Sequence, residues 1–416
     1  MSGSKSDAET IQSAAIGAPV ARLDEASYQD GIQERQAIVD AHAVEGSKDE
    51  SVWQAENEEL LHELKEGTEE LELSHSRIRT LRGFETHLRR LAPSLKRINL
   101  RQNLINKLKF TPKIVATEAG SAPLEAKDLE SDHFSPQILV QEETDQAISP
   151  FEPLKLLEEL DLYDNQIAKI EGLDHLHNLK TLDFSFNTIR RIENLDSLTS
   201  LTTLYLIQNK ISQIEALDNL ANTLTSLELG SNRIRHITNL SCLTNLTELW
   251  LGRNKISKLE GLDALVNLRS LSIQSNRIIK LEGLDNLVKL EELYISHNGL
   301  TSIGEGLSAN NKLRVLDVGA NEINDMKGIE GLSELEELWA NNNKLTVAGW
   351  SAIENSLSQS AMPHLQTVYL EGNPLQLEMG ANYRRKIMLA CPQLVQIDAT
   401  YVFSLSRPPL PPLCDL

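Results

Sequence analysis

The residues of this chain that could carry out chemistry do not form a catalytic or metal-binding arrangement. His175 and His177 are the only close pair among ten histidines, and no cysteine or carboxylate stands at a spacing that would complete a metal site. Cys242, Cys391 and Cys414 show neither disulfide nor metal spacing and suit a reducing compartment. The sequence holds no glycine-rich phosphate loop, HExxH motif or nucleophile elbow. We therefore predict a binding protein with no catalytic residue, cofactor or metal.

A second set of residues recurs at a fixed spacing and suits protein binding. Each lies between two strand leucines and points away from them: Asp161, Asp183, Tyr205, Glu228, Trp250, Ser272, Tyr294, Asp317, Trp339 and Tyr369. Half of these positions hold Tyr or Trp, although aromatic residues make up only 4% of the chain. Aromatic anchors among carboxylates are typical of a surface that binds a protein with apolar and basic patches. The alternative interpretation is that the rings merely fill a pleated sheet, which favours them.

Carboxylates also recur two positions earlier, at the start of the same strands. They are Glu159, Glu248, Glu292 and Glu337. Parallel strands about 4.8 Å apart would make the whole row of positions on the order of 45 Å long. That length is enough to hold a folded protein.

These positions belong to a phrase that is repeated along the chain, Leu-x-x-Leu-x-Leu-x-x-Asn-x-Ile/Leu. Its Asn recurs every 22 or 23 residues, at Asn165, Asn187, Asn209, Asn232, Asn254, Asn276, Asn298, Asn321 and Asn343. This pattern is the leucine-rich repeat. We predict an α/β solenoid of about twelve repeats with a concave parallel β-sheet and short 3-10 or helical turns on the convex side. Each buried Asn is expected to bond backbone groups that no strand ladder satisfies.

The composition predicts an acidic, disordered tail before the repeats, at residues 1–65. Within it, residues 53–64 could form a short helix that caps the first repeat or meets a partner, or that forms only transiently. The repeat domain is predicted at 66–403. It contains a disordered insertion at about 109–153, which is polar, acidic and rich in proline.

The carboxyl-terminal end of the domain departs from the repeat pattern. A helix and a return strand at about 376–403 are predicted to cap the solenoid, because an uncapped end would expose leucines to water. Residues 404–416 form a proline-rich tail. Such a tail is either extended or a polyproline ligand.

The formal charge of -20 argues against nucleic acid phosphates or an anionic membrane as the main partner. No apolar run approaches the roughly 20 residues that span a bilayer, and the first residues hold no signal-peptide core. We therefore expect an intracellular protein that is monomeric when free.

Several stretches resemble one family in detail. They are Leu160-Asp-Leu-Tyr-Asp-Asn-Gln-Ile167, Leu227-Glu-Leu-Gly-Ser-Asn-Arg-Ile-Arg235, Tyr294-Ile-Ser-His-Asn298, Val368-Tyr-Leu-Glu-Gly-Asn-Pro-Leu375 and the cap segment Tyr383-Arg-Arg-Lys-Ile-Met-Leu389. Over roughly residues 71–403 the chain resembles the leucine-rich-repeat regulatory subunit of type-1 serine/threonine protein phosphatase, the protein phosphatase 1 regulatory subunit 7 family.

The resemblance implies a non-catalytic protein of the nucleus and cytoplasm. Its concave face would hold the protein phosphatase 1 catalytic subunit and control the activity, maturation or localisation of that enzyme, with a third regulatory protein as a possible addition. The contact positions that it implies are Asp183, Tyr205, Glu228, Trp250, Asp317, Glu337, Trp339 and Tyr369, and Tyr294 joins them from the same row.

The chain departs from the family at the insertion after Leu108, which leaves the amino-terminal contacts open. Lys107-Leu-Lys-Phe110 is similar to the short docking motif of phosphatase regulators, but Leu108 occupies a core position of the repeat, so we do not assign it that role.

Two other classes of function remain open from the residues alone. One is a scaffold of an RNA-processing particle, which the acidic charge disfavours unless a partner carries the RNA contact. The other is a GTPase-activating repeat protein, a class that uses longer repeats with true convex helices.

Overall fold

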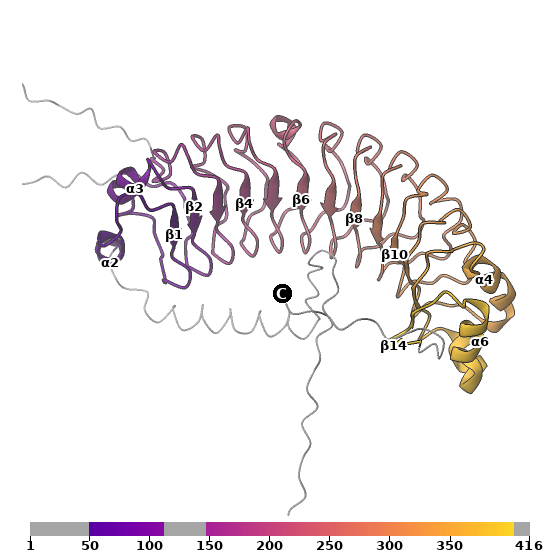
Figure 1. Cartoon of the computed structure of the whole chain (residues 1–416). Helices are drawn as coiled ribbons and strands as arrows, with labels where there is room; N and C mark the ends of the chain where they lie inside the picture. Colours follow the sequence, from indigo (N-terminus) through magenta and orange to yellow (C-terminus); the bar gives the residue numbers. More distant parts are fainter. Residues whose placement is uncertain (1–49, 112–146, 403–416) are drawn as a thin grey trace, which may run out of the picture. The chain divides into compact units, whose positions relative to one another are not determined.

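The computed structural model describes residues 50–111 and 147–402, and the described residues from Trp53 onward form one compact unit (Figure 1). Its strands form a single sheet in which spatial order follows sequence order. The strands are β1 (Glu70–Glu72), β2 (Arg97–Asn99), β3 (Glu159–Asp161), β4 (Thr181–Asp183), β5 (Thr203–Tyr205), β6 (Ser226–Glu228), β7 (Glu248–Trp250), β8 (Ser270–Ser272), β9 (Glu292–Tyr294), β10 (Val315–Asp317), β11 (Glu337–Trp339), β12 (Thr367–Tyr369), β13 (Gln396–Ile397) and β14 (Thr400–Tyr401).

Strands β1 to β13 pair in parallel, which confirms the predicted leucine-rich-repeat solenoid. Each strand is only two or three residues long, and its leucine points into the core while the residues beside it point outward. In the repeat of β3, for example, Leu160 and Leu162 are buried with Ile167 and Ile170 from the convex segment. Convex turns such as the one that starts at Leu173 close through i to i+3 hydrogen bonds, which are of the predicted 3-10 type.

The predicted Asn ladder is present. The Asn187 side chain accepts a hydrogen bond from the Ile167 backbone N–H at 2.9 Å and donates to the carbonyls of Leu162 and Phe184 at 2.9 and 3.1 Å. Asn254 makes the same set of bonds in its own repeat. Because each Asn joins its own turn to the preceding one, the row holds adjacent repeats in register.

The amino-terminal boundary differs from the prediction. Residues 50–65, expected in the disordered tail, contain helix α2 (Glu50–His62), which is followed by α3 (Glu85–Leu91). Leu61 is fully buried against the first repeat, and Asn57 donates two hydrogen bonds of 2.8 Å to the carbonyls of Thr80 and Arg82. The helix is therefore a cap of the array, one of the two roles considered for it. The remainder of the predicted tail, residues 1–49, lies outside the described residues.

The boundaries of the insertion are also narrower than predicted. Phe110 and Ile148 form an antiparallel bridge with two hydrogen bonds of 3.0 Å, and Phe151 is fully buried. The residues that flank the insertion thus belong to the repeat, since they supply its backbone pairing and its core side chains. Residues 112–146 lie outside the described part of the chain.

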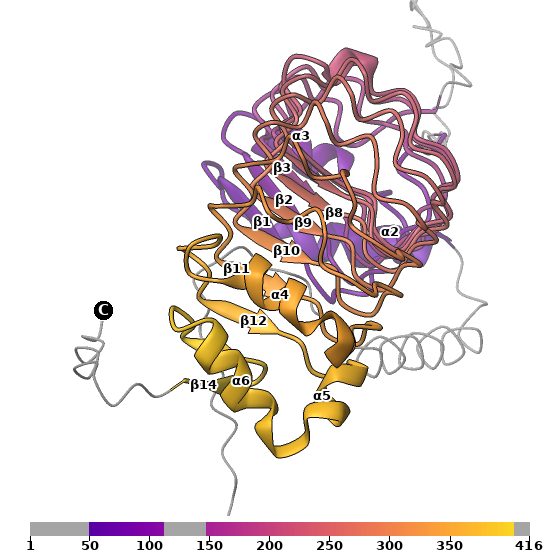
Figure 2. The same ribbon diagram turned by 90° about the vertical axis from the view of Figure 1, so that its right-hand side faces the viewer.

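The carboxyl-terminal cap contains the predicted helix and return strand (Figure 2). After the repeats come η2 (Val347–Gly349), α4 (Trp350–Leu357), α5 (Pro374–Met379), η3 (Gly380–Asn382) and α6 (Tyr383–Ala390), while η1 (Asp218–Leu220) lies within the array. The hydroxyl of Tyr383 donates to Asp398 at 3.0 Å, and that carboxylate accepts the Leu370 N–H at 2.8 Å, so the cap is bonded to the last long strand. The predicted tail at 404–416 lies beyond the described residues.

Candidate protein-binding face

One row of side chains runs across the outward face of the sheet, and we call it the aromatic-acidic column. It consists of the last residue of each strand from β3 to β12, namely Asp161, Asp183, Tyr205, Glu228, Trp250, Ser272, Tyr294, Asp317, Trp339 and Tyr369. The parallel register places each member directly beside the next. All but Ser272 are partly exposed, so the structure brings together every column residue predicted to bind a partner.

Ser272 departs from the prediction, because it is buried at 1% exposure rather than facing solvent. Its neighbours in register are Trp250 and Tyr294, whose rings stack with centroids 6.3 Å apart and planes 19° apart. The small serine side chain leaves room for the two larger rings to approach each other above it. Sequence alternation gives the direction of a side chain but not the size of its neighbours.

The carboxyl-terminal end of the column is an aromatic pair with a carboxylate beside it. Trp339 and Tyr369 stack with ring centroids 4.6 Å apart and planes 25° apart. The indole N–H of Trp339 donates to Glu337 Oε2 at 3.2 Å, and Gln396 Nε2 donates to the Tyr369 hydroxyl oxygen at 2.7 Å. Both rings are therefore held in position before a partner arrives, which lowers the entropy lost on binding.

The amino-terminal half of the column gathers carboxylates. Burial raises the pKa of Glu228 to about 7, with further increases from the nearby charges of Asp183 and Glu248. Burial likewise raises the pKa of Asp183, which the hydrogen bonds that it accepts from Ser185 oppose. The pKa of Asp161 is raised to about 6, chiefly by burial. A cation of a binding partner would stabilise the charged form of these carboxylates.

Asp317 and Tyr294 lie between these two groups and already bond residues of the chain. Asp317 accepts hydrogen bonds from the Ser296 hydroxyl at 2.7 Å and the Gly319 N–H at 3.0 Å. The Tyr294 hydroxyl lies 3.4 Å from Glu292 Oε2, and burial is the main cause of its raised pKa. These bonds fix the direction of both side chains on the sheet face.

A second outward row lies beside the column and was not predicted from the sequence. It follows the second leucine of each repeat, and at Tyr163 it holds an aromatic ring with the guanidinium of Arg101 4.2 Å from its centroid. The ring of Phe186 lies 4.7 Å from that of Tyr163, and Arg101 also pairs with Asp161 at 3.3 Å. Continuing the two-residue alternation past Leu162 would have identified Tyr163, because every second residue of a strand faces the same way.

Other candidate groups do not form a site among the residues that the structure describes. His175 is exposed, and no cluster of three metal-ligating side chains is present within the described ranges. Cys391 is buried, which raises its thiol pKa to about 12 and suits packing rather than reactivity. Leu108 is fully buried and Phe110 packs against the core, so Lys107 to Phe110 is part of a repeat. No described helix is long and apolar enough to cross a membrane.

Comparison with known protein families gives the same fold. Residues 138–251 match the family described as leucine-rich repeat, residues 266–309 match leucine rich repeats (2 copies), and residues 288–345 match a further leucine rich repeat family.

Among curated proteins, the chain is 59% identical over 56 residues to protein phosphatase 1 regulatory subunit 7 of Xenopus tropicalis, covering 14% of this chain and 15% of that protein. It is 54% identical over 44 residues to protein phosphatase 1 regulatory subunit SDS22 of Saccharomyces cerevisiae, covering 10% and 13%. For SDS22 of Schizosaccharomyces pombe, the identity is 46% over 61 residues, covering 15% and 18%. The matched stretches thus span less than a fifth of each relative, and they support the resemblance to this family.

Solved structures agree on the fold alone. An internalin, InlF, of Listeria monocytogenes superimposes with a TM-score of 0.54 at 22% identity, covering 84% of this chain and 95% of that one. The leucine-rich-repeat protein LIC12759 of Leptospira interrogans gives a TM-score of 0.52 at 21% identity, with coverage of 75% and 74%.

Proposed function

We propose that this chain, a leucine-rich-repeat protein that resembles protein phosphatase 1 regulatory subunit 7 and SDS22, is a non-catalytic regulatory subunit of protein phosphatase 1. It binds the catalytic subunit through the aromatic-acidic column and controls the activity, maturation or localisation of that enzyme. The relatives are named phosphatase subunits, so we prefer this function to an RNA-processing scaffold. We place the complex in nucleus and cytoplasm, and the free chain is a monomer that a third regulatory protein could join.

The observation that carries this proposal is the fixed cluster of Trp339, Tyr369 and Glu337. Two stacked rings 4.6 Å apart offer an apolar anchor, and the carboxylate beside them offers an acceptor for a cationic side chain. The carboxylates Asp183 and Glu228 at the other end of the column suit basic residues of the same partner, because neutralising them removes the unfavourable burial of their charge.

A pull-down of the full chain with the protein phosphatase 1 catalytic subunit tests the proposal. We expect the wild-type chain to retain the phosphatase and Trp339→Ala to lose it. Tyr401→Ala is the matched control, because this ring is 55% exposed and lies in β14, outside the column. Phosphatase activity measured in the bound fraction distinguishes a complex in which the enzyme is inhibited from one in which the enzyme stays active and is only localised. Capture that Trp339→Ala leaves unchanged would disprove the site, and absence of capture by the wild type would disprove the partner.

A further inference from the structure

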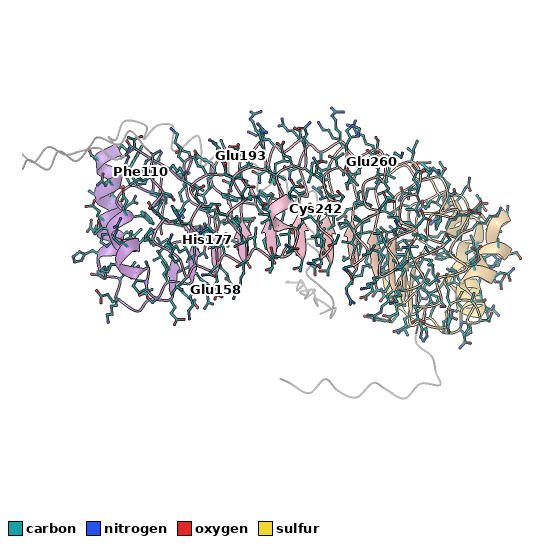
Figure 3. The ribbon with its side chains drawn as sticks, turned by 90° about the horizontal axis from the view of Figure 1, so that it is seen from above. Phe110, Glu158, His177, Glu193, Cys242 and Glu260 are labelled. Atoms are coloured by element: carbon teal, nitrogen blue, oxygen red, sulfur yellow. The ribbon has the colours of Figure 1, made fainter. Side chains whose placement is uncertain are left out.

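The segments that follow the ladder Asn residues lie in a row and form one long edge of the repeat array. Residues at the same distance after parallel, in-register strands lie in a row, and backbone bonds link neighbouring segments, such as Arg233 N–H to the Ile211 carbonyl at 2.8 Å. In Figure 3, Glu193 and Glu260, each two residues after a segment of this edge, lie on one side of the ribbon, and Glu158 lies on the other.

Six consecutive segments of this edge are strongly basic, and we call them the basic edge. They are residues 166–169, 188–191, 210–213, 233–236, 255–258 and 277–280, which together hold ten Lys or Arg residues and no Asp or Glu. The chain as a whole has a formal charge of -20. The basic edge is therefore a positively charged surface on a protein whose net charge is negative.

Part of this charge is neutralised within the chain and part is not. Three of the cations at the far ends of these segments pair with glutamates of the chain: Lys169 with Glu171 at 3.7 Å, Arg191 with Glu215 at 3.0 Å and Lys280 with Glu282. In four successive repeats the first residue after the ladder Asn is a cation without an ion pair to any residue in the described ranges: Lys210, Arg233, Lys255 and Arg277.

These four cations repel one another unless an anion lies along them. Arg233 and Arg277 are exposed, and Lys210 and Lys255 are partly exposed, so all four are accessible to a ligand. Successive repeats place them about 5 Å apart, which is within the Debye length of about 8 Å at physiological salt. A ligand with several carboxylates in an extended chain matches this spacing.

The chain's own insertion begins and ends beside this edge. Ser149, just after the insertion, donates a hydrogen bond of 2.6 Å from its hydroxyl to the carbonyl of Gly172. Lys109, just before it, pairs with Asp174 at 2.9 Å. Gly172 follows the first basic segment closely in sequence, and Figure 3 places Phe110 on the same side of the ribbon as Glu193.

The composition and length of residues 112–146 suit the edge. These 35 residues hold eight Asp or Glu and two Lys. Half of this length, extended at about 3.3 Å per residue, reaches about 55 Å before the chain returns. Arg277 lies six repeats beyond the flanking repeat, a distance of about 30 Å at the strand spacing. A tethered segment also binds at an effective concentration of about a millimolar, so that weak ion pairs suffice.

We propose that the basic edge is a binding site for an acidic polypeptide segment, and that residues 112–146 of this chain are the segment that occupies it. Nucleic acid is the other polyanion that such an edge could bind. The insertion is favoured because both of its flanks lie beside the edge, whereas the charge of -20 repels a free polyanion.

Carbodiimide cross-linking of the full chain tests this inference, because the reagent joins a lysine to a carboxylate only where the two are in contact. At low salt we expect mass spectrometry to find Lys210, Lys255 or Lys258 joined to acids of residues 118–145, with yields that fall several-fold in 0.5 M salt. Lys180 pairs with Glu158 across from this edge and is the matched control, for which no such cross-link is expected. In the variant Arg233→Gln/Arg277→Gln, the yield at Lys210 and Lys255 should fall at least threefold.

Three outcomes would overturn the inference. One is that no cross-link joins the lysines of the edge to the segment. Another is that a mixture of isotope-labelled and unlabelled chains shows only cross-links between chains, which would assign the edge to association of two copies. The third is that a single-stranded RNA oligonucleotide at 0.15 M salt abolishes the cross-links and binds the chain through Arg233 and Arg277. None of these results depends on phosphatase binding, so the inference stands or falls separately from the proposed function.

Discussion

Trp339 and Tyr369 are thirty residues apart in the sequence and lie face to face in the structure, with ring centroids 4.6 Å apart. Their strands β11 and β12 are in register although the repeat between them is stretched by helix α4. The additional residues are accommodated on the convex side, so the sheet face continues without a gap. The Tyr369 ring therefore stacks on the Trp339 ring despite the longer repeat between them.

We predict that Trp339→Ala weakens binding of the protein phosphatase 1 catalytic subunit by about 2 kcal/mol or more, which is about thirtyfold in the dissociation constant. The loss arises because the variant lacks the large ring that the partner would bury. The Tyr369 ring also loses the ring on which it stacks. Isothermal titration calorimetry of Trp339→Ala, Tyr369→Ala and the double variant should give a coupling energy of about 1 kcal/mol between the two rings. Additive losses would show that the stack does not act as one anchor.

Binding should also release protons, because cations of the partner would lower the raised pKa of Glu228. At pH 6.5 we expect up to one proton to be released per complex, seen as a binding enthalpy that depends on the ionisation enthalpy of the buffer. Glu228→Gln should reduce this release. If the buffer dependence of the variant equals that of the wild type, Glu228 does not pair with the partner.

The same residue should make the stability of the free chain depend on pH. The pKa of Glu228 is raised from 4.5 to about 7, so the folded state keeps a proton that the unfolded chain has lost between these values. Stability from this group is therefore lost as the pH rises through that window and is constant above it. Glu228→Gln should gain on the order of 2 kcal/mol relative to wild type between pH 5 and pH 8, measured by urea unfolding. A pH-independent difference between the two chains would contradict this assignment.

Much of the binding face could be predicted because it follows from a two-residue alternation fixed by leucines. Asp183, Tyr205 and Trp250 lie where the phrase places them, since a short parallel strand leaves little freedom of direction. The burial of Ser272 and the raised pKa of Glu228 could not be predicted in this way. Both depend on side chains that are 20 residues or more away in sequence and that only the stacked structure brings together.

The sequence left the role of α2 open between a cap, a partner-binding helix and a transient helix for a related reason. Its sequence, which includes Leu60, Leu61 and several acids, has little apolar patterning, so composition alone places it with the tail. The first repeat orders this helix. It supplies the Thr80 and Arg82 carbonyls that accept hydrogen bonds from the helix and the apolar surface that buries Leu61. The sequence of the helix itself does not show that the first repeat provides these contacts.

The Asn ladder makes a direct prediction about stability. Asn254→Ala should lower the free energy of unfolding by about 2 kcal/mol, because it leaves the buried Ile234 N–H without its acceptor and removes one of the two side-chain donors to each of the Leu229 and Leu251 carbonyls. Asn245→Ala is the matched control, since this exposed side chain makes one hydrogen bond, to the Asn222 carbonyl, and its loss should change stability by less than about 1 kcal/mol. Equal urea midpoints for the two variants would show that the ladder is not needed for stability.

The amino-terminal cap makes the last prediction. Leu61→Ala should lower the free energy of unfolding by about 3 kcal/mol, because it opens a cavity beneath α2 that the first repeat cannot refill. Leu60→Ala, one residue away and 42% exposed, is the matched control and should have little effect. Hydrogen exchange should place the loss at β1 and α3, while strands near Trp339 keep their protection, because repeats contact only their neighbours. If Leu61→Ala left the exchange of β1 unchanged, α2 would not be a cap of the array in solution.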